Sequence, residues 1–185
     1  MRKTWELIRP TFVLVVVCAV ISGLLALTYN LAGVAELANA GYSEEQLAEY
    51  AASALPQADR LEQVEAESEN PDLKFVYRAA NGAGMAVVLN VKGYDSTRMV
   101  IMYGFDPEGV MQGLSVISDN ETPGIGKKVI ADTEYLAQYA GLTEADLNSA
   151  VDAVSGATKT SDGIRTGARA AFEVFAELSG EVLGS

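Results

Sequence analysis

The sequence of 185 residues contains no histidine and only one cysteine, Cys18. Without histidine there is no Ser-His-Asp triad, no Cys-His catalytic pair and no histidine-ligated haem or zinc. A single cysteine allows neither an intrachain disulfide nor a thiolate metal cluster. We therefore expect no catalytic residue and no metal site in this chain, so that any redox or group-transfer chemistry needs a cofactor.

Positive charge is also scarce. The chain has 13 Lys and Arg against 25 Asp and Glu, a net charge of −12 at pH 7. Proteins that bind nucleic acids gain most of their affinity by neutralising phosphates with Lys and Arg. This balance excludes a nucleic-acid partner.

A long uncharged segment near the N-terminus predicts a membrane-spanning helix. No charged residue occurs from Thr11 to Ala35, and this stretch exceeds the ~20 residues that a helix needs to cross a bilayer. A cleaved signal sequence is the alternative, but its apolar core is usually only ~7–15 residues long. The best cleavage motif, Ala38-Asn39-Ala40, lies well beyond the apolar run. We expect an uncleaved single-pass anchor over residues 11–35.

The charges around this segment predict its orientation. Residues 1–35 carry three basic side chains (Arg2, Lys3 and Arg9) and one acidic side chain, which leaves −14 for the rest of a chain whose total is −12. Basic residues stay on the cytoplasmic side of a membrane. We therefore expect residues 1–10 in the cytoplasm, the anchor in the cytoplasmic (inner) membrane, and the acidic C-terminal part outside.

Residues 36–72 predict a helical and acidic connector. Ser43-Glu-Glu-Gln46 has the pattern of a capping box, in which Gln46 reaches back to the backbone of Ser43. An apolar stripe with helical spacing continues from there until Pro56. The Glu-rich stretch from Gln57 to Asp72 is interpreted as a solvated connector or an irregular first strand.

Residues 73–185 predict one α+β domain. Its β-prone segments are short and are separated by turn residues, a pattern typical of an antiparallel sheet. They cover residues 74–77, 85–91, 98–103 and 110–117. Helical periodicity follows over residues 127–139 and, after a short helix at 143–146, from Thr160 onward. Strands followed by helices indicate an antiparallel sheet with flanking helices.

Two loops interrupt this plan. Glu121-Thr-Pro-Gly-Ile-Gly126 leaves the fourth of these strands, and Asp152-Ala-Val-Ser-Gly-Ala-Thr158-Lys-Thr-Ser161 precedes the last helix. Exposed backbone N–H groups in such loops, close to a helix start, favour an anion. Each loop also has an ordinary interpretation as a capped turn, with Thr122 as the cap of the first and Thr160 or Ser161 as the cap of the second. Neither loop decides the function by itself.

In this order, and behind one N-terminal anchor, Gly93-Tyr94 and the two loops resemble the FMN-binding G subunit of Rnf-type ion-translocating electron-transport complexes. More distantly, they are similar to the C subunit of the Na⁺-translocating NADH:quinone reductase. The resemblance covers nearly the whole chain, and Asp152-x-x-Ser-Gly-Ala-Thr158 is its most specific part. It implies that the phosphate of FMN is esterified to Thr158. It also implies a flavin transferase that makes this bond from FAD and recognises Asp152, Ser155, Gly156 and Ala157.

A covalent bond suits this chain on physical grounds. The phosphate of FMN carries roughly two negative charges at neutral pH, so an acidic domain repels the free cofactor. A diester removes one of these charges and makes the remaining contacts intramolecular, at an effective concentration of about millimolar. Lys127, Lys128 and Lys159 offset the repulsion locally, and we place Lys159 near the phosphate. On the resemblance and the loop chemistry together, we expect flavin contacts from Thr122, Gly124 and Gly126.

In this interpretation the flavin carries the electrons, whereas the chain positions it and tunes its environment. A single transmembrane helix encloses no ion path, so partner subunits must supply the electron donor, the electron acceptor and the channel. We expect an electron-transfer subunit of a membrane-bound oxidoreductase complex that translocates Na⁺ or H⁺. A free-standing membrane-anchored flavoprotein reductase or sensor is the alternative. A non-redox adhesion or assembly module is a third interpretation.

Overall fold

The computed structural model describes residues 11–24, 41–94 and 98–184. The chain divides into two compact units, Met1–Gly41 and Tyr42–Ser185, which we describe separately. In the first unit, residues 11–24 form a helix whose side chains are all exposed. No helix within the described residues combines the length and the apolar character that a membrane crossing requires. The expected anchor extends over residues 25–35 as well, and these lie outside the described residues, as do residues 1–10.

The second unit begins with α3 (Glu44–Ala54), which forms where the capping box predicts it. The Ser43 hydroxyl accepts a hydrogen bond from the Gln46 N–H, and the Gln46 side-chain oxygen accepts one from the Ser43 N–H at 3.1 Å. The helix ends where Leu55 leaves the helical conformation, directly before Pro56. Leu47, Ala51 and Ala54 are buried, so α3 packs against the domain and belongs to the same compact unit as residues 73–184.

A five-stranded antiparallel sheet forms the centre of this unit, as expected. Its strands follow one another in space as they do along the chain, each pairing with the next. They are β1 (Leu61–Val64), β2 (Leu73–Ala79), β3 (Met85–Lys92), β4 (Arg98–Phe105) and β5 (Met111–Ser118). β1 lies within the Glu-rich stretch, so the irregular-strand interpretation of that stretch is confirmed.

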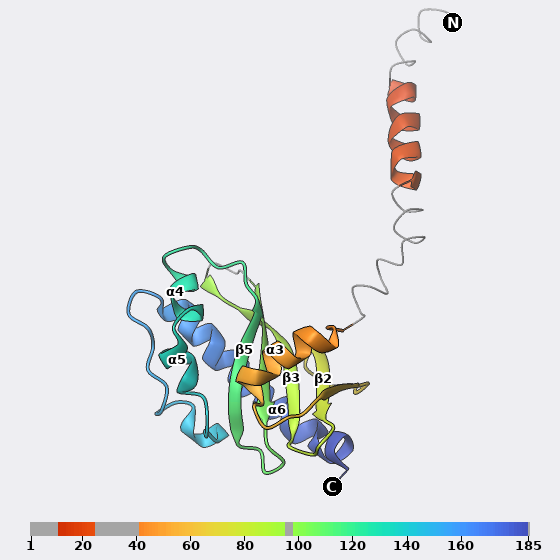
Figure 1. The fold of residues 1–185 in the computed structure, drawn as a ribbon. Helices are drawn as coiled ribbons and strands as arrows, with labels where there is room; N and C mark the ends of the chain where they lie inside the picture. The colour runs from red at the N-terminus through yellow and green to blue at the C-terminus, as the bar shows by residue number, and fades with distance from the viewer. Residues whose placement is uncertain (1–10, 25–40, 95–97, 185) are drawn as a thin grey trace, which may run out of the picture. The chain divides into compact units, whose positions relative to one another are not determined.

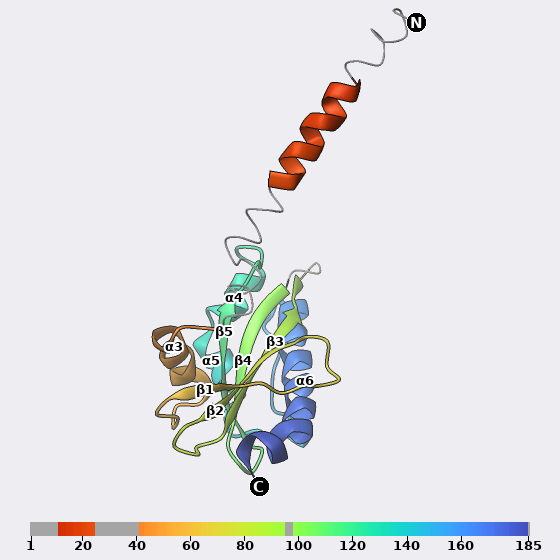
Figure 2. The same ribbon diagram turned by 90° about the vertical axis from the view of Figure 1, so that its right-hand side faces the viewer.

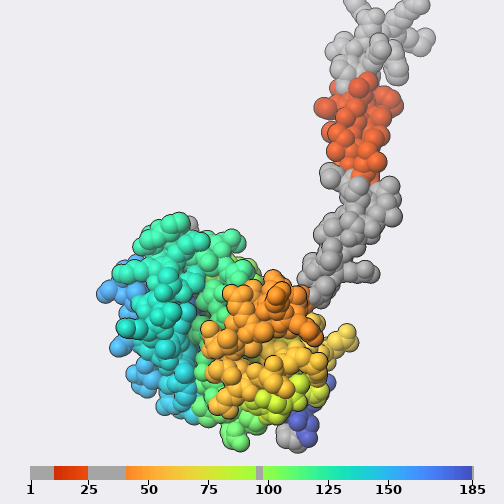
Figure 3. Space-filling model, in the orientation of Figure 1, coloured from red at the N-terminus to blue at the C-terminus, as the bar shows by residue number. Residues whose placement is uncertain are grey.

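Helices cover both faces of the sheet, which is why β3 is buried on both sides. Figure 2 shows the sheet between α3 on one side and α6 (Thr158–Leu183) on the other. Ala86 and Val88 of β3 face the α3 core, whereas Val87, Leu89 and Val91 face the α6 core. This alternation follows from the period of two along a strand. Figure 3 shows the face of the molecule on which α3, in orange, lies beside the yellow and green surface of the strands.

The region between β5 and α6 differs from its prediction. Two short helices, α4 (Gly126–Ile130) and α5 (Thr133–Ala137), replace the single helix expected over residues 127–139. The break arises at Asp132, whose carboxylate accepts a hydrogen bond from the Tyr135 N–H at 3.0 Å and caps α5. Periodicity alone gives no sign of this break. A 3-10 helix, η2 (Glu144–Asp146), follows with a capping box at Thr143, close to the expected short helix.

α6 is the longest helix of this unit and starts at Thr158 rather than Thr160. Its N-cap is Ala157, so the interpretation of Thr160 or Ser161 as the cap is wrong, and both lie inside the first turn. Glycine at position 163 lets the helix approach β3 closely, because a Cβ there would lie 2.1 Å from the Lys92 carbonyl oxygen. Consequently the end of β3 and the start of α6 meet at one end of the domain (Figure 1).

Candidate functional site

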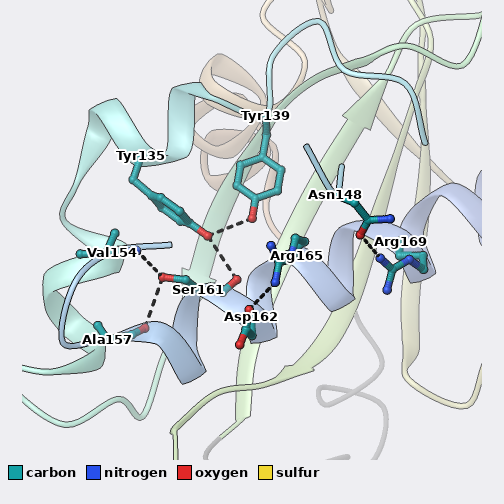
Figure 4. A network of polar contacts seen from close by, with 9 residues as sticks. All are labelled: Tyr135, Tyr139, Asn148, Val154, Ala157, Ser161, Asp162, Arg165 and Arg169. Carbon is teal, nitrogen blue, oxygen red and sulfur yellow. Dashed lines mark hydrogen bonds and ion pairs between the residues drawn. The ribbon is translucent and has the colours of Figure 1, made fainter. Parts of the chain in front are cut away.

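The loop of residues 152–157 leads into α6 and is held to the helix by Ser161. The Ser161 hydroxyl accepts a hydrogen bond from the Val154 N–H at 3.1 Å and donates one to the Ala157 carbonyl at 3.2 Å. Figure 4 shows both bonds closing the loop onto the first turn of the helix. Farther back, the Asp152 N–H donates to the Gln138 side-chain oxygen at 2.9 Å. The side chains of Ser161 on α6 and of Gln138 after α5 therefore hold the loop in place, in addition to the bonds within the loop itself.

The hydroxyl groups in this segment differ sharply in exposure. Ser155 and Thr158 are exposed, whereas Thr160 and Ser161 are 0% and 2% exposed and their hydroxyls are hydrogen-bonded. An esterification partner can reach only an exposed hydroxyl. Thr158, at the first position of α6, and Ser155 are therefore accessible to such a partner, whereas Thr160 and Ser161 are not.

The start of α6 is suited to an anion. No side chain caps this described helix end, and its first turn contains no acidic residue. The first N–H groups of an α-helix have no partner within the helix, and the helix dipole places partial positive charge there. A phosphate on the Thr158 side chain would lie at this end, as anions do at other helix N-termini.

Glu121 is the buried carboxylate of the site, with only 3% of its surface exposed. Its Oε1 accepts a hydrogen bond from the Tyr94 N–H at 3.0 Å, and its Oε2 accepts one from the Thr160 hydroxyl at 3.0 Å. Glu121 therefore joins Gly93-Tyr94, the 121–126 loop and the first turn of α6. The three segments that carry the sequence motif are in contact through one side chain.

The loop after Glu121 presents two of the expected flavin contacts and buries the third. Thr122 and Gly124 are exposed, and Gly124 has a φ of +80°, a conformation that favours glycine. Gly126 is buried against Glu121, and a Cβ at this position would lie 1.7 Å from Glu121 Oε2. The Thr122 side chain does not cap α4, whose N-cap is Ile125 without a side-chain bond. The interpretation of Thr122 as this cap is therefore wrong.

Three lysines border the same end of the domain. Lys159 lies over the Tyr94 ring, with Nζ 5.2 Å from the ring centroid. Lys127 is 3.7 Å from the Asp119 carboxylate, and both Lys127 and Lys128 are exposed. The ion pair is long and its lysine is exposed, so the pair is weak and Lys127 remains available to an anionic group.

A cleft of about 410 Å³ opens between β3 and the first half of α6. Lys92 and Gly93 line it from the strand, and Lys159, Asp162 and Gly163 line it from the helix. It therefore adjoins the segment that carries Thr158. Across the described parts of the chain, acidic and cysteine side chains form no group of three that could hold a metal ion.

Buried tyrosines stabilise the first turns of α6 through hydrogen bonds. The hydroxyls of Tyr135 and Tyr139 lie 3.0 Å apart, and the Tyr135 hydroxyl donates to the Ser161 carbonyl at 3.2 Å (Figure 4). The Tyr103 hydroxyl donates to the Ile164 carbonyl at 3.0 Å. Burial raises the pKa of Tyr135 and Tyr139, and it raises the pKa of Tyr103 well above its ordinary value. Tyr135 and Tyr103 are neutral donors to the first turns of the helix, and Tyr139 bonds the Tyr135 hydroxyl.

Sequence reasoning missed the roles of Glu121, Thr160, Ser161 and Tyr135. It treated Glu121 as one letter of a motif, and it did not predict that the carboxylate is buried and accepts two hydrogen bonds. It considered Thr160 and Ser161 as caps or as hydroxyls available at the helix start, and it did not predict that both are buried and hydrogen-bonded. No local signal identifies Tyr135, because its partner Ser161 is 26 residues away in the sequence.

Comparisons with known proteins identify the family of the chain. Residues 93–173 match the family model of the FMN-binding domain. The G subunit of the ion-translocating oxidoreductase complex of Methanosarcina acetivorans is 30% identical to this chain over 89% of this chain and 92% of its own length. The G subunit of the Na⁺-translocating ferredoxin:NAD⁺ oxidoreductase complex of Acetobacterium woodii is 27% identical over 95% of each chain.

The fold also has a counterpart among solved structures. The crystal structure of NqrC from Shewanella oneidensis superposes with a TM-score of 0.50 and covers 72% of this chain and 73% of that chain. Their sequences are 22% identical, so this likeness concerns the fold alone. From its relatives and its FMN-binding domain, the chain belongs to the family of the G subunits of Rnf-type ion-translocating oxidoreductase complexes.

Proposed function

We propose that this protein is an electron-transfer flavoprotein subunit of a membrane-bound, ion-translocating oxidoreductase complex, with FMN esterified through its phosphate to Thr158. Family membership supports the complex and the cofactor. The observation that carries the attachment site is the contrast in exposure. Thr158 is exposed at the start of α6, whereas Thr160 and Ser161 are buried and hydrogen-bonded.

The chain's own contribution is to bind and orient the flavin. The uncapped start of α6 stabilises a phosphodiester at Thr158. Lys159 adds positive charge beside it while lying over the Tyr94 ring. The exposed residues of the 121–126 loop, Thr122 and Gly124, offer a hydroxyl and an open backbone to the cofactor. Bound FMN supplies the redox chemistry.

Attachment needs a second protein. In this proposal, a flavin transferase uses FAD as the donor and recognises the loop that precedes Thr158. The Thr158 hydroxyl loses its proton and forms a bond to the phosphorus of the FMN half, while the pyrophosphate bond of FAD breaks and AMP leaves. The exposure of Asp152, Ser155 and Gly156 supports this assignment, because a docking enzyme can contact them. Ala157 is buried, and its small side chain allows the loop to turn tightly into the helix.

We further propose that residues 11–35 anchor the protein in the cytoplasmic membrane, with residues 1–10 inside and the flavin domain outside. The uncharged segment and the basic residues before it support this topology. The electron donor, the electron acceptor and the path of the ion belong to partner subunits. Purification of the tagged full chain in detergent should then recover several polytopic membrane proteins, whereas recovery of a solitary chain would favour a free-standing flavoprotein.

The attachment is tested by expressing the full chain with a flavin transferase and examining it on a denaturing gel. Wild-type protein should give a band with flavin fluorescence. Thr158→Ala should remove the fluorescence and leave the circular dichroism spectrum unchanged. Thr133→Ala is the matched control, because Thr133 is an exposed threonine at the first position of another helix, α5. A fluorescent Thr158→Ala band would refute the attachment site.

A further inference from the structure

We infer that Glu121 is a positioning residue for flavin attachment, and that the Thr160 hydroxyl serves as its hydrogen-bond donor and not as an acceptor of FMN. This inference rests on the proposed esterification of Thr158. It assigns a role to two residues that the motif alone leaves without one. The role is to hold the first turn of α6 in the orientation that presents Thr158.

The geometry of Glu121 uses both oxygens of the carboxylate. Oε1 accepts from the Tyr94 N–H at 3.0 Å, and Oε2 accepts from the Thr160 hydroxyl at 3.0 Å. Tyr94 is 27 residues before Glu121 and Thr160 is 39 residues after it. Glu121 therefore cross-links segments that are distant in the sequence, and it does so from a position that is 3% exposed.

Gly126 packs directly against the Glu121 side chain and restricts its position. Gly126 lies so close that an added Cβ would come within 1.7 Å of Oε2 and 2.8 Å of the Glu121 Cβ. Thr160 is 0% exposed, so its hydroxyl has no route to solvent. Hydrogen bonds to a charged acceptor are stronger than neutral ones. The contact therefore fixes Thr160, and with it the backbone two residues after Thr158.

A carboxylate is the group that this arrangement requires. Each of its oxygens accepts a hydrogen bond, and neither needs a proton of its own. In Glu121→Gln the side chain keeps its shape, but one oxygen becomes an NH₂ group that cannot accept. The remaining oxygen still accepts from the Tyr94 N–H, but the NH₂ group can bond Thr160 only by donating to its hydroxyl oxygen. The bond to Thr160 is then reversed, and the Thr160 hydroxyl loses its charged acceptor.

The experiment measures flavin attachment to the purified full-length apo chain by a flavin transferase with FAD. Three variants are compared. Glu121→Gln removes one of the two accepting oxygens, and Thr160→Val removes the hydroxyl while keeping the shape of the side chain. Thr160→Ser keeps the hydroxyl. We expect kcat to fall about tenfold in Glu121→Gln and Thr160→Val. We expect Thr160→Ser to stay within about twofold of wild type, and KM to change little because the exposed recognition residues are untouched.

The double variant Glu121→Gln/Thr160→Val gives a further test. If the two side chains act through one hydrogen bond, the double variant is about as slow as the slower single variant. Multiplicative losses would show independent effects and overturn the proposal. So would a wild-type rate in Thr160→Val, or a Thr160→Ser rate as low as that of Thr160→Val.

Two controls separate folding and site assignment from positioning. Circular dichroism and urea unfolding check each variant, and Thr160→Ala replaces Thr160→Val should the latter not fold. Trypsin cleaves after Lys159, so peptide 129–159 carries label on Thr158 and peptide 160–165 carries label on Thr160. Label in the second peptide of the wild type overturns both proposals. Loss of label in Thr158→Ala with a normal Thr160→Val overturns only the positioning role.

Discussion

Replacement of Gly126 by alanine tests whether this glycine serves Glu121 or the flavin. The added Cβ would lie 1.7 Å from Glu121 Oε2, 2.6 Å from Cδ and 2.8 Å from Cβ. Moving the carboxylate alone does not relieve the last contact, so the loop itself must shift. We expect Gly126→Ala to displace Glu121 and to break its bonds to Tyr94 and Thr160.

The expected cost follows from these bonds. A hydrogen bond to a charged group contributes about 1.5–3 kcal/mol, so losing two costs about 3–6 kcal/mol. Alanine in place of glycine at the start of α4 returns up to about 1 kcal/mol of helix propensity. The net loss in the free energy of unfolding should be about 2–5 kcal/mol, a large part of the stability of an ordinary domain.

Gly124→Ala is the matched control in the same loop. Position 124 has no atom within 4 Å of an added Cβ, but its φ is +80°. Only backbone strain of about 1 kcal/mol is therefore expected. Urea unfolding of the full chain in detergent, followed by far-UV circular dichroism, measures both variants. If Gly126→Ala is no more destabilising than Gly124→Ala, then Glu121 is not held as we describe.

Other consequences concern the buried hydroxyls. Ser161→Ala removes the acceptor of the Val154 N–H and the donor to the Ala157 carbonyl. It should lower the free energy of unfolding by about 1–3 kcal/mol and speed hydrogen exchange of the Val154 amide. Unchanged exchange at Val154 would contradict this role of Ser161. Tyr103→Phe removes one buried bond to Ile164 and should cost about 1 kcal/mol in urea unfolding. Burial raises the pKa of Tyr103, Tyr135 and Tyr139, so their contribution to stability is complete below pH ~10, the unfolded pKa, and is lost as the pH rises above it. Absorbance at 295 nm should show these phenols ionising together with unfolding, and their ionisation in the folded protein would contradict this.

Much of the fold was predictable because its signals are local. Short β-prone segments separated by turn residues predict β2 to β5, and the Ser43–Gln46 capping box predicts the start of α3. The helical periodicity gave the wrong prediction where a single side chain decides between one helix and two. Asp132 divides the expected helix at 127–139 by capping α5, and a residue of that kind is also compatible with the exposed face of a single helix.

The sequence motif could be recognised, but the contacts between its three segments could not be predicted. Gly93-Tyr94, the 121–126 loop and the segment before α6 are recognisable separately, and their resemblance to a known family brings them together. The contacts that join them depend on Glu121, whose partners are 27 and 39 residues away. Residue spacing carries no information on such contacts, because the folding of the sheet and the path of α6 create them. Burial of Thr160 and exposure of Thr158 follow from the same packing.

The most direct measurement is the mass of the tryptic peptides of the protein isolated from its native cells. Peptide 129–159 contains Thr158, and peptide 160–165 contains Thr160 and Ser161. We predict that the first peptide is heavier than its amino acids by one FMN less one water, and that fragmentation places this mass on Thr158. A peptide 129–159 with the mass of its amino acids alone would contradict the account.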